Sequence, residues 1–154
     1  MENLALFGGK LVILVAPGPQ SAKLEVDPAK FDVIAVAGDF WRMSRLMVPR
    51  VLPRIDVAYP GPSFVSRCSW YSWDRPAGTV FKTAFEHRRF DEVPVPEGFV
   101  DYNFSFEEKC NQVGCNLTTG MAAILDILAE NPAQLYLHGF TFYKSDSPYI
   151  QGYA

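Results

Sequence analysis

Histidine and cysteine are scarce in this chain of 154 residues, and basic residues are not in excess. Only His87 and His138 occur, and neither lies at a zinc-binding spacing from another histidine or a cysteine. The three cysteines, Cys68, Cys110 and Cys115, follow no repeated spacing, so we expect buried, reduced thiols. A formal net charge of −3 argues against bulk electrostatic binding to nucleic acid or anionic membrane.

Long apolar runs are also missing. No segment approaches the roughly 20 consecutive apolar residues that a membrane span requires, and the N-terminus carries neither the basic region nor the cleavage site of a signal peptide. We therefore expect a cytoplasmic protein without a membrane span. The sequence also lacks a serine-hydrolase elbow, a Walker phosphate loop and a G-x-G-x-x-G dinucleotide fingerprint. The length and a hydrophobic content of 49% fit one globular domain over residues 1–154.

What the sequence does contain is a series of short apolar runs that end in glycine or proline. Lys10–Ala16 is continuous and β-branched, as expected of a strand buried on both faces of a parallel sheet. Phe31–Ala37 has the same character, and we predict further strands at 54–59, 78–85 and 135–137. Residues 94–98 are expected to form a loop that leads into an acidic and aromatic stretch. The pattern predicts an α/β domain with a mostly parallel central sheet flanked by helices.

Three helical segments are expected between these strands. Asp27 can cap a short helix that begins at Pro28, and a second helix is predicted over Trp41–Leu52. The third begins after Thr118 or Thr119 and is stopped by the Asn131-Pro132 pair. Its apolar face is predicted to consist of Met121, Ile124, Leu125 and Leu128, with Asp126 directed to solvent.

Polar and glycine residues follow the predicted strands and open the third helix, where ligands bind in open α/β sheets. Gly18 would let the backbone approach a phosphate, although an ordinary tight turn is the alternative. Asp39 could accept from a ribose hydroxyl or a base amine, or it could be a solvated turn residue. His138 could serve as an acid or base, or as a hydrogen-bonded structural histidine.

The order of these motifs resembles that of the sialyltransferase-like glycosyltransferases, both the animal family and its small bacterial, phage or viral relatives. In that family a strand leads to a G-x-G-P-S turn and a later strand ends near asparagine; here Val12–Pro19 and Phe31–Asp39 correspond. The second family motif is a [ST]-[ST]-G helix start followed by a strand that ends in Gly-Phe. Leu117–Ala123 and Leu135–Phe140 match it in order and spacing. The resemblance covers roughly half of the chain.

The resemblance implies a Rossmann-like fold and transfer of a sialic-acid-like sugar from a CMP-activated donor to a glycan acceptor, with no essential metal or other cofactor. It assigns substrate contacts to the two motifs, namely Gly18, Pro19, Thr118, Thr119, Gly120, Gly139 and Phe140. To these we add Asp39, which would hold the ribose or base, and Tyr143 or Tyr149, which would donate a hydrogen bond to the phosphate. His138 is the candidate catalytic base. The family has asparagine at the position of Asp39 and a further histidine after its Gly-Phe pair, whereas no histidine follows His138 in this sequence.

Three alternatives remain open at this point. The chain could be a degenerate relative that binds a nucleotide without transferring a sugar. It could be a pyrophosphate-handling, pterin diphosphokinase-like enzyme, because that group shares the early glycine-proline turn. It could also be an assembly protein whose 14% aromatic content contributes to a homo-oligomer interface.

Overall fold

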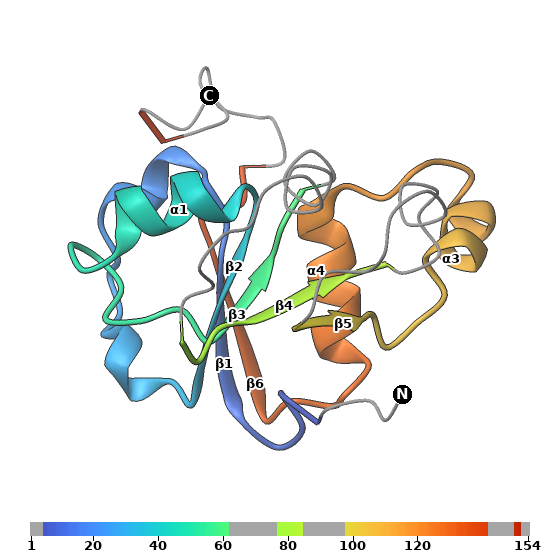
Figure 1. Cartoon of the computed structure of the whole chain (residues 1–154), viewed down its shortest axis with the longest axis horizontal. Coiled ribbons are helices and arrows are strands. Elements are labelled where there is room, and N and C mark those ends of the chain that lie inside the picture. Colours follow the sequence, from blue (N-terminus) through green and yellow to red (C-terminus); the bar gives the residue numbers. More distant parts are fainter. Residues whose placement is uncertain (1–4, 62–76, 85–97, 142–149, 152–154) are drawn as a thin grey trace.

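A six-stranded parallel sheet forms the centre of the molecule (Figure 1). The computed structural model describes residues 5–61, 77–84, 98–141 and 150–151. The strands run in the order β5-β4-β3-β2-β1-β6, and every neighbouring pair is parallel. Their bounds are β1 Leu11–Val15, β2 Val33–Ala37, β3 Val57–Tyr59, β4 Val80–Thr83, β5 Phe99–Asp101 and β6 Gln134–His138. The fold is therefore of the α/β, Rossmann-like type that the sequence predicts.

Helices cover both faces of the sheet (Figure 1). The described α-helices are α1 Phe40–Met47, α3 Phe106–Val113 and α4 Thr119–Leu128, and the 3-10 helices are η1 Pro19–Ala22 and η2 Pro28–Lys30. Alternate residues of β1 and β2 serve the two faces, as the side-chain period of a strand requires. On one face Ile13 and Val36 pack with Met43 of α1, and on the other Leu14 and Ala35 share a core with α4.

The strand order reverses at β1. Strands β2 to β5 follow one another on one side of β1, and the chain then returns to place β6 on the other side of β1. The loops that leave β1 and β6 therefore diverge at the carboxyl edge of the sheet. A parallel sheet opens a crevice for ligands at such a point.

Most of the predicted elements are confirmed, with shifted ends. The helix predicted over Trp41–Leu52 ends at Met47, before Pro49. Asp27 caps η2 by accepting from the amide of Ala29, and Thr118 caps α4 by accepting from the amide of Met121. Strand β5 and helix α3 were not predicted from the sequence.

The predicted orientation of α4 is wrong. Met121 and Leu128 are 38% and 49% exposed, whereas Asp126, which we expected in solvent, is fully buried. The face that packs on the sheet is made of Ala122, Ala123, Asp126 and Ile127. The helix turns this way because a buried cation of the sheet lies opposite Asp126, as described below.

The expectation that the cysteines are buried holds for only one of the two that the structure describes. Cys110 is buried in α3, where its sulfur accepts from the amide of Leu117, and Cys115 is exposed. Both are free thiols, and Cys68 lies outside the described residues. In the described part of the chain, no helix has the length and apolarity needed to cross a membrane.

Candidate functional site

A cavity of about 950 Å³ lies at the carboxyl edge of the sheet. Its walls come from the ends of β1, β2 and β6 and from helices on both faces of the sheet. The lining residues are Ala16–Gly18, Ala37–Asp39, Arg42, Gly61, Lys109, Val113, Cys115–Met121, Leu125 and Gly139–Thr141. Its volume falls in the range of small-molecule sites, and it occupies the crevice that the strand order predicts.

Two glycines hold the diverging loops together at the base of this cavity. The amide of Gly18 donates to the carbonyl of Gly139 at 2.9 Å. A Cβ atom on Gly18 would lie 2.0 Å from the Gly139 carbonyl oxygen, and one on Gly139 would lie 2.0 Å from Oγ of Ser21. Gly139 also has a φ of +78°, which favours glycine. The loop after β1 and the loop after β6 can approach this closely only because both positions lack a side chain.

The loop after β1 offers few backbone donors to a ligand. Pro17 and Pro19 have no amide hydrogen, and the amides of Gly18 and Ser21 donate to Gly139 and Gly18. Gly18 therefore shapes the wall of the cavity, and its amide is already engaged within the protein. Any phosphate in this cavity has to find its donors elsewhere.

The first turn of α4 provides such donors. Thr118 accepts from Met121 at 3.2 Å through its side chain, so one of the free amides at the helix start is satisfied. The amides of Thr119 and Gly120 come earlier in the turn and have no acceptor within the helix. Both residues line the cavity, so the positive end of the α4 dipole faces it.

A second helix start faces the cavity from the other side of the sheet. Asp39 caps α1, with Oδ1 accepting from the amide of Trp41 at 3.2 Å, and it lines the cavity together with Arg42. Lys109 of α3 supplies a further cation. The cavity therefore contains one carboxylate, two cations and two helix N-termini among its described residues, an arrangement that suits an anionic ligand with hydroxyl groups.

The structure brings together seven of the sequence-predicted substrate contacts in this cavity. They are Gly18, Asp39, Thr118, Thr119, Gly120, Gly139 and Phe140. Pro19 begins η1 and does not line the cavity. Tyr143 and Tyr149 lie outside the described residues.

His138, the candidate base, lies beside the cavity and is not one of its lining residues. Strand alternation places its ring with Tyr136, and the two rings stack with centroids 6.4 Å apart. Nε2 lies 2.9 Å from the carbonyl of Gln20, and because a carbonyl can only accept, Nε2 carries the hydrogen. In neutral imidazole Nδ1 is then the proton acceptor, so His138 keeps the chemistry of a base while it holds η1 in place.

Several lining residues were missed by sequence reasoning. Lys109, Val113 and Cys115 belong to α3 and the segment after it, and this helix was not predicted. Arg42 was placed on the correct helix, but nothing in the sequence shows that the helix start turns toward the crevice. The signal that was available for α3 is Ser105, followed three residues later by Glu108, which is a capping-box pattern.

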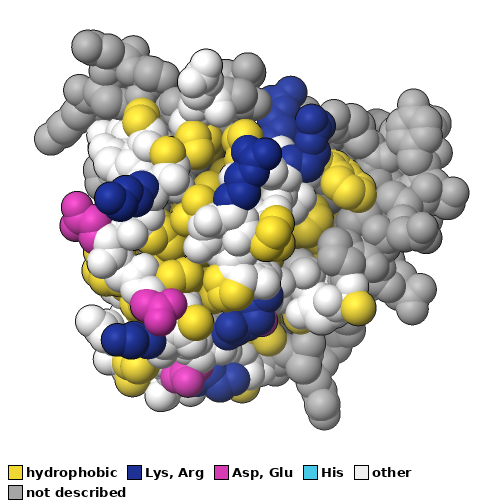
Figure 2. All heavy atoms as spheres, turned by 90° about the vertical axis from the view of Figure 1, so that its left-hand side faces the viewer, with side chains coloured by type: hydrophobic (Ala, Val, Ile, Leu, Met, Phe, Trp, Pro, Cys, Tyr) yellow, Lys and Arg dark blue, Asp and Glu magenta, His cyan; other side chains and the backbone are white. Residues whose placement is uncertain are grey.

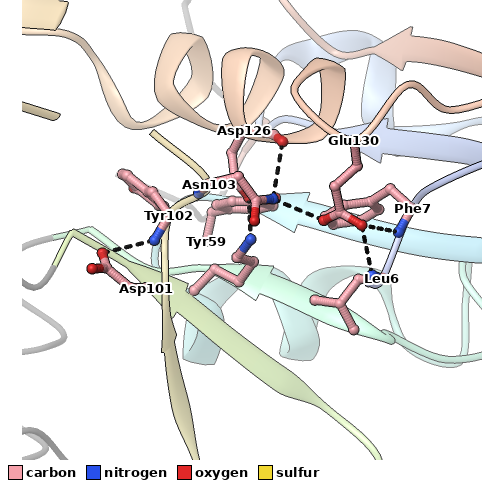
Figure 3. Close-up of polar contacts among 9 residues, drawn as sticks. Leu6, Phe7, Tyr59, Asp101, Tyr102, Asn103, Asp126 and Glu130 are labelled. Atoms are coloured by element: carbon pink, nitrogen blue, oxygen red, sulfur yellow. Dashed lines mark hydrogen bonds and ion pairs between the residues drawn. The ribbon is translucent and has the colours of Figure 1, made fainter. Parts of the chain in front are cut away.

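A buried polar network supports α4 beneath the cavity (Figure 3). Oδ2 of Asp126 accepts from the Tyr59 hydroxyl at 2.6 Å and lies 2.6 Å from Nζ of Lys82, while Oδ1 accepts from the amide of Asn103. One turn later, Glu130 accepts from the side chain of Asn103 at 2.8 Å. It also accepts from the amides of Leu6 and Phe7. The network ties α4 to β3, β4, the segment after β5 and the N-terminal segment, so the helix start is held at a fixed position.

Burial changes the acidity of two tyrosines in this region. Loss of hydration raises the pKa of the Tyr59 hydroxyl well above its ordinary value, and the negative charge and hydrogen bond of Asp126 add to the effect. The pKa of Tyr102 is raised for the same main reason, burial, with contributions from Asp126 and Asp101. Within the described residues, no group of three or more histidine, cysteine, aspartate or glutamate side chains could hold a metal ion.

No protein-family model matches the sequence, and neither a curated protein nor a solved structure is significantly similar to it.

Proposed function

We propose that this protein is a small glycosyltransferase that uses a CMP-activated, sialic-acid-like sugar as donor and a glycan as acceptor. The observation that carries the proposal is the position of Thr118, Thr119 and Gly120 at an α4 start that opens into the same cavity as Asp39. A nucleotide monophosphate has a phosphate for the helix start and ribose hydroxyls for a carboxylate. The resemblance in motif order supports the choice of cytidine and of sugar.

In the proposed reaction, an acceptor hydroxyl attacks the anomeric carbon of the donor while the bond from that carbon to the phosphate oxygen breaks. CMP departs with the bonding electron pair, and the acceptor proton passes to a base. The amides of Thr119 and Gly120 are placed to stabilise the developing charge on the phosphate by preorganised dipoles, and Arg42 and Lys109 add positive charge. These groups supply charge compensation without a metal, so we expect transfer to persist in EDTA.

Calorimetric titration of the full chain tests the donor assignment. We expect saturable binding of CMP and weaker binding of UMP, AMP and ATP. Incubation with CMP-N-acetylneuraminate, followed by measurement of released CMP, then tests the chemistry. Preference for another nucleotide would refute the cytidine assignment, and preference for ATP would favour the diphosphokinase-like alternative.

A second candidate, a nucleotide-binding module without transfer activity, is favoured by one observation. Among the described residues that line the cavity, no side chain is an imidazole, and His138 lies beside it. This alternative predicts CMP binding with no release of CMP from the donor sugar. Substitution His138→Gln separates the two, because a catalytic His138 predicts lost transfer with retained CMP binding, whereas the module predicts no change in either measurement.

A further inference from the structure

Helix α1 presents an exposed surface that combines an aromatic ring with cations. We define the α1 surface as Trp41, Arg42 and Arg45. Both arginines are exposed, and Trp41 is 42% exposed. Trp41 and Arg45 are four residues apart and therefore neighbours on one side of the helix, and Arg42 is one turn before Arg45. The opposite side of α1 packs on the sheet through Phe40, Met43 and Met47.

The charge on this surface is of one sign. Residues 40–55 contain four arginines and no aspartate or glutamate, in a chain whose net charge is −3. Arg54 pairs with Asp56 at 3.0 Å and is not part of the surface. On the face of the molecule that α1 occupies, a group of basic side chains lies in the upper part among apolar ones, whereas the acidic side chains at the left edge and in the lower part each lie beside a basic side chain (Figure 2). A local positive field therefore exists on an acidic protein.

The α1 surface is continuous with the cavity. Arg42 lines the cavity, and Trp41 and Arg45 extend from it along the same helix. We propose that the α1 surface is the acceptor subsite and that it selects an acidic saccharide, a glycan that bears a carboxylate near the accepting hydroxyl. This proposal rests on the proposed glycosyltransferase function and adds the class of acceptor.

The chemistry of the two residue types supports an acidic saccharide. The flat apolar face of an exposed tryptophan fits the C–H face of a pyranose ring. The guanidinium fork of arginine binds a carboxylate through two parallel hydrogen bonds, with a geometry that lysine lacks. A neutral glycan would use only the ring of Trp41, and an extended polyanion would need cations over a longer path than one short helix. A sugar ring with a carboxylate uses both groups.

Saturation-transfer NMR on the full chain tests the inference with defined probes. The probes are sialyllactose and a hyaluronan tetrasaccharide, each compared with its carboxyl methyl ester. We expect the acids to bind at least fivefold more tightly than the esters, and we expect Arg45→Ala to abolish that difference. Trp41→Ala should weaken the acids and the esters by a similar factor, because the ring contacts the sugar and not its charge.

Lys30→Ala is the matched control, because it removes one exposed cation from η2, which precedes β2 and therefore lies at the opposite edge of the sheet. CMP titration of every variant separates this inference from the proposed function. CMP binding combined with equal affinity for acids and esters, or with no binding of either, would overturn the acceptor assignment alone. If the unmodified protein did not bind CMP at all, the proposed function itself would be overturned. Tighter binding of a short oligodeoxynucleotide than of the acids, abolished by Arg45→Ala, would show a nucleic-acid surface and also refute the saccharide.

Discussion

Lys82 and Asp126 form a fully buried ion pair, with Nζ of Lys82 2.6 Å from Oδ2 of Asp126. Nζ makes no hydrogen bond of good geometry to any residue that the structure describes, and it lies 5.7 Å from the ring centroid of Phe7. The pair therefore acts mainly through charge, while Tyr59 and Asn103 satisfy the carboxylate by hydrogen bonds. It joins strand β4 to helix α4, whose first turn lines the cavity.

Substitution Lys82→Met should lower the free energy of unfolding by about 3–5 kcal/mol, because it leaves the Asp126 charge buried without its cation. Urea denaturation measures the loss. The double variant Lys82→Met/Asp126→Asn should lose less than the sum of the two single variants, since neither charge then remains unpaired. Lys10→Met removes an exposed lysine and is the control. A loss below about 1 kcal/mol in Lys82→Met would contradict the importance of the pair.

Substitution Gly18→Ala should destabilise the protein by about 1–3 kcal/mol and weaken CMP binding, because the new methyl group meets the Gly139 backbone. The φ of Gly18 is −65°, which suits any residue, so the effect is one of space alone. Gly61→Ala is the control: Gly61 also lines the cavity, and a Cβ there meets no described atom within 4 Å. Equal thermal stability of the two variants would refute the packing argument.

The protein should lose stability at alkaline pH, starting near pH 10. The folded state raises the pKa of Tyr59 and Tyr102, so above their ordinary pKa the unfolded chain releases protons that the folded chain retains. The free energy of unfolding therefore falls as pH rises. The stability that the two protonated tyrosines contribute is fully present only below about pH 10. Tyr102→Phe should flatten this dependence in denaturation measured from pH 8 to pH 11. If Tyr102→Phe left the pH dependence of the free energy of unfolding unchanged, this would argue against a raised pKa of Tyr102.

Removal of the α4 cap should weaken nucleotide binding. Thr118→Val keeps the shape of the side chain but leaves the amide of Met121 without its acceptor, at a cost of about 1 kcal/mol in stability. Ser105→Ala removes the corresponding cap of α3, where the hydroxyl accepts from the amide of Glu108 at 3.2 Å, and Ser105 does not line the cavity. Calorimetry should show a loss of CMP affinity in Thr118→Val only. A similar loss in both would indicate a general effect of stability.

Cys115 provides a chemical report of cavity occupancy. Its thiol is exposed at the cavity wall, whereas Cys110 is buried. Saturating CMP should slow the alkylation of Cys115 severalfold, as measured by mass spectrometry of the peptide that contains it. Alkylation at the same rate with and without CMP, despite calorimetric binding, would place the nucleotide elsewhere.

The sequence predicts the sheet of this protein well and the helices less well. Lys10–Ala16 and Phe31–Ala37 were recognised because a strand covered on both faces needs apolar residues at every position, and this signal is local. The three residues of β5 are too few to show a period, and α3 ends before an apolar face becomes regular. These two elements were therefore missed, and Lys109 and Cys115 with them.

The orientation of α4 shows a different limit. Helical periodicity places a charged residue among apolar ones on the solvent side, and this argument directed Asp126 outward. The residue that reverses the conclusion is Lys82, on a strand 44 positions earlier, and no local pattern connects the two. Candidate site residues at strand and helix ends are easier to predict from the sequence, because parallel strands bring their carboxyl ends to one edge of the sheet whatever the details of packing.

The pairing of β6 with β1 sets the order in which the site can be completed during synthesis. Strand β1 leaves the ribosome before the other described strands, but its partner at the cavity base, the loop after β6, follows only after those strands have been made. Until then the edge of β1 is open, and the wall formed by Gly139 and Phe140 does not exist. The cavity therefore cannot be complete until translation has passed residue 140 and this segment has emerged.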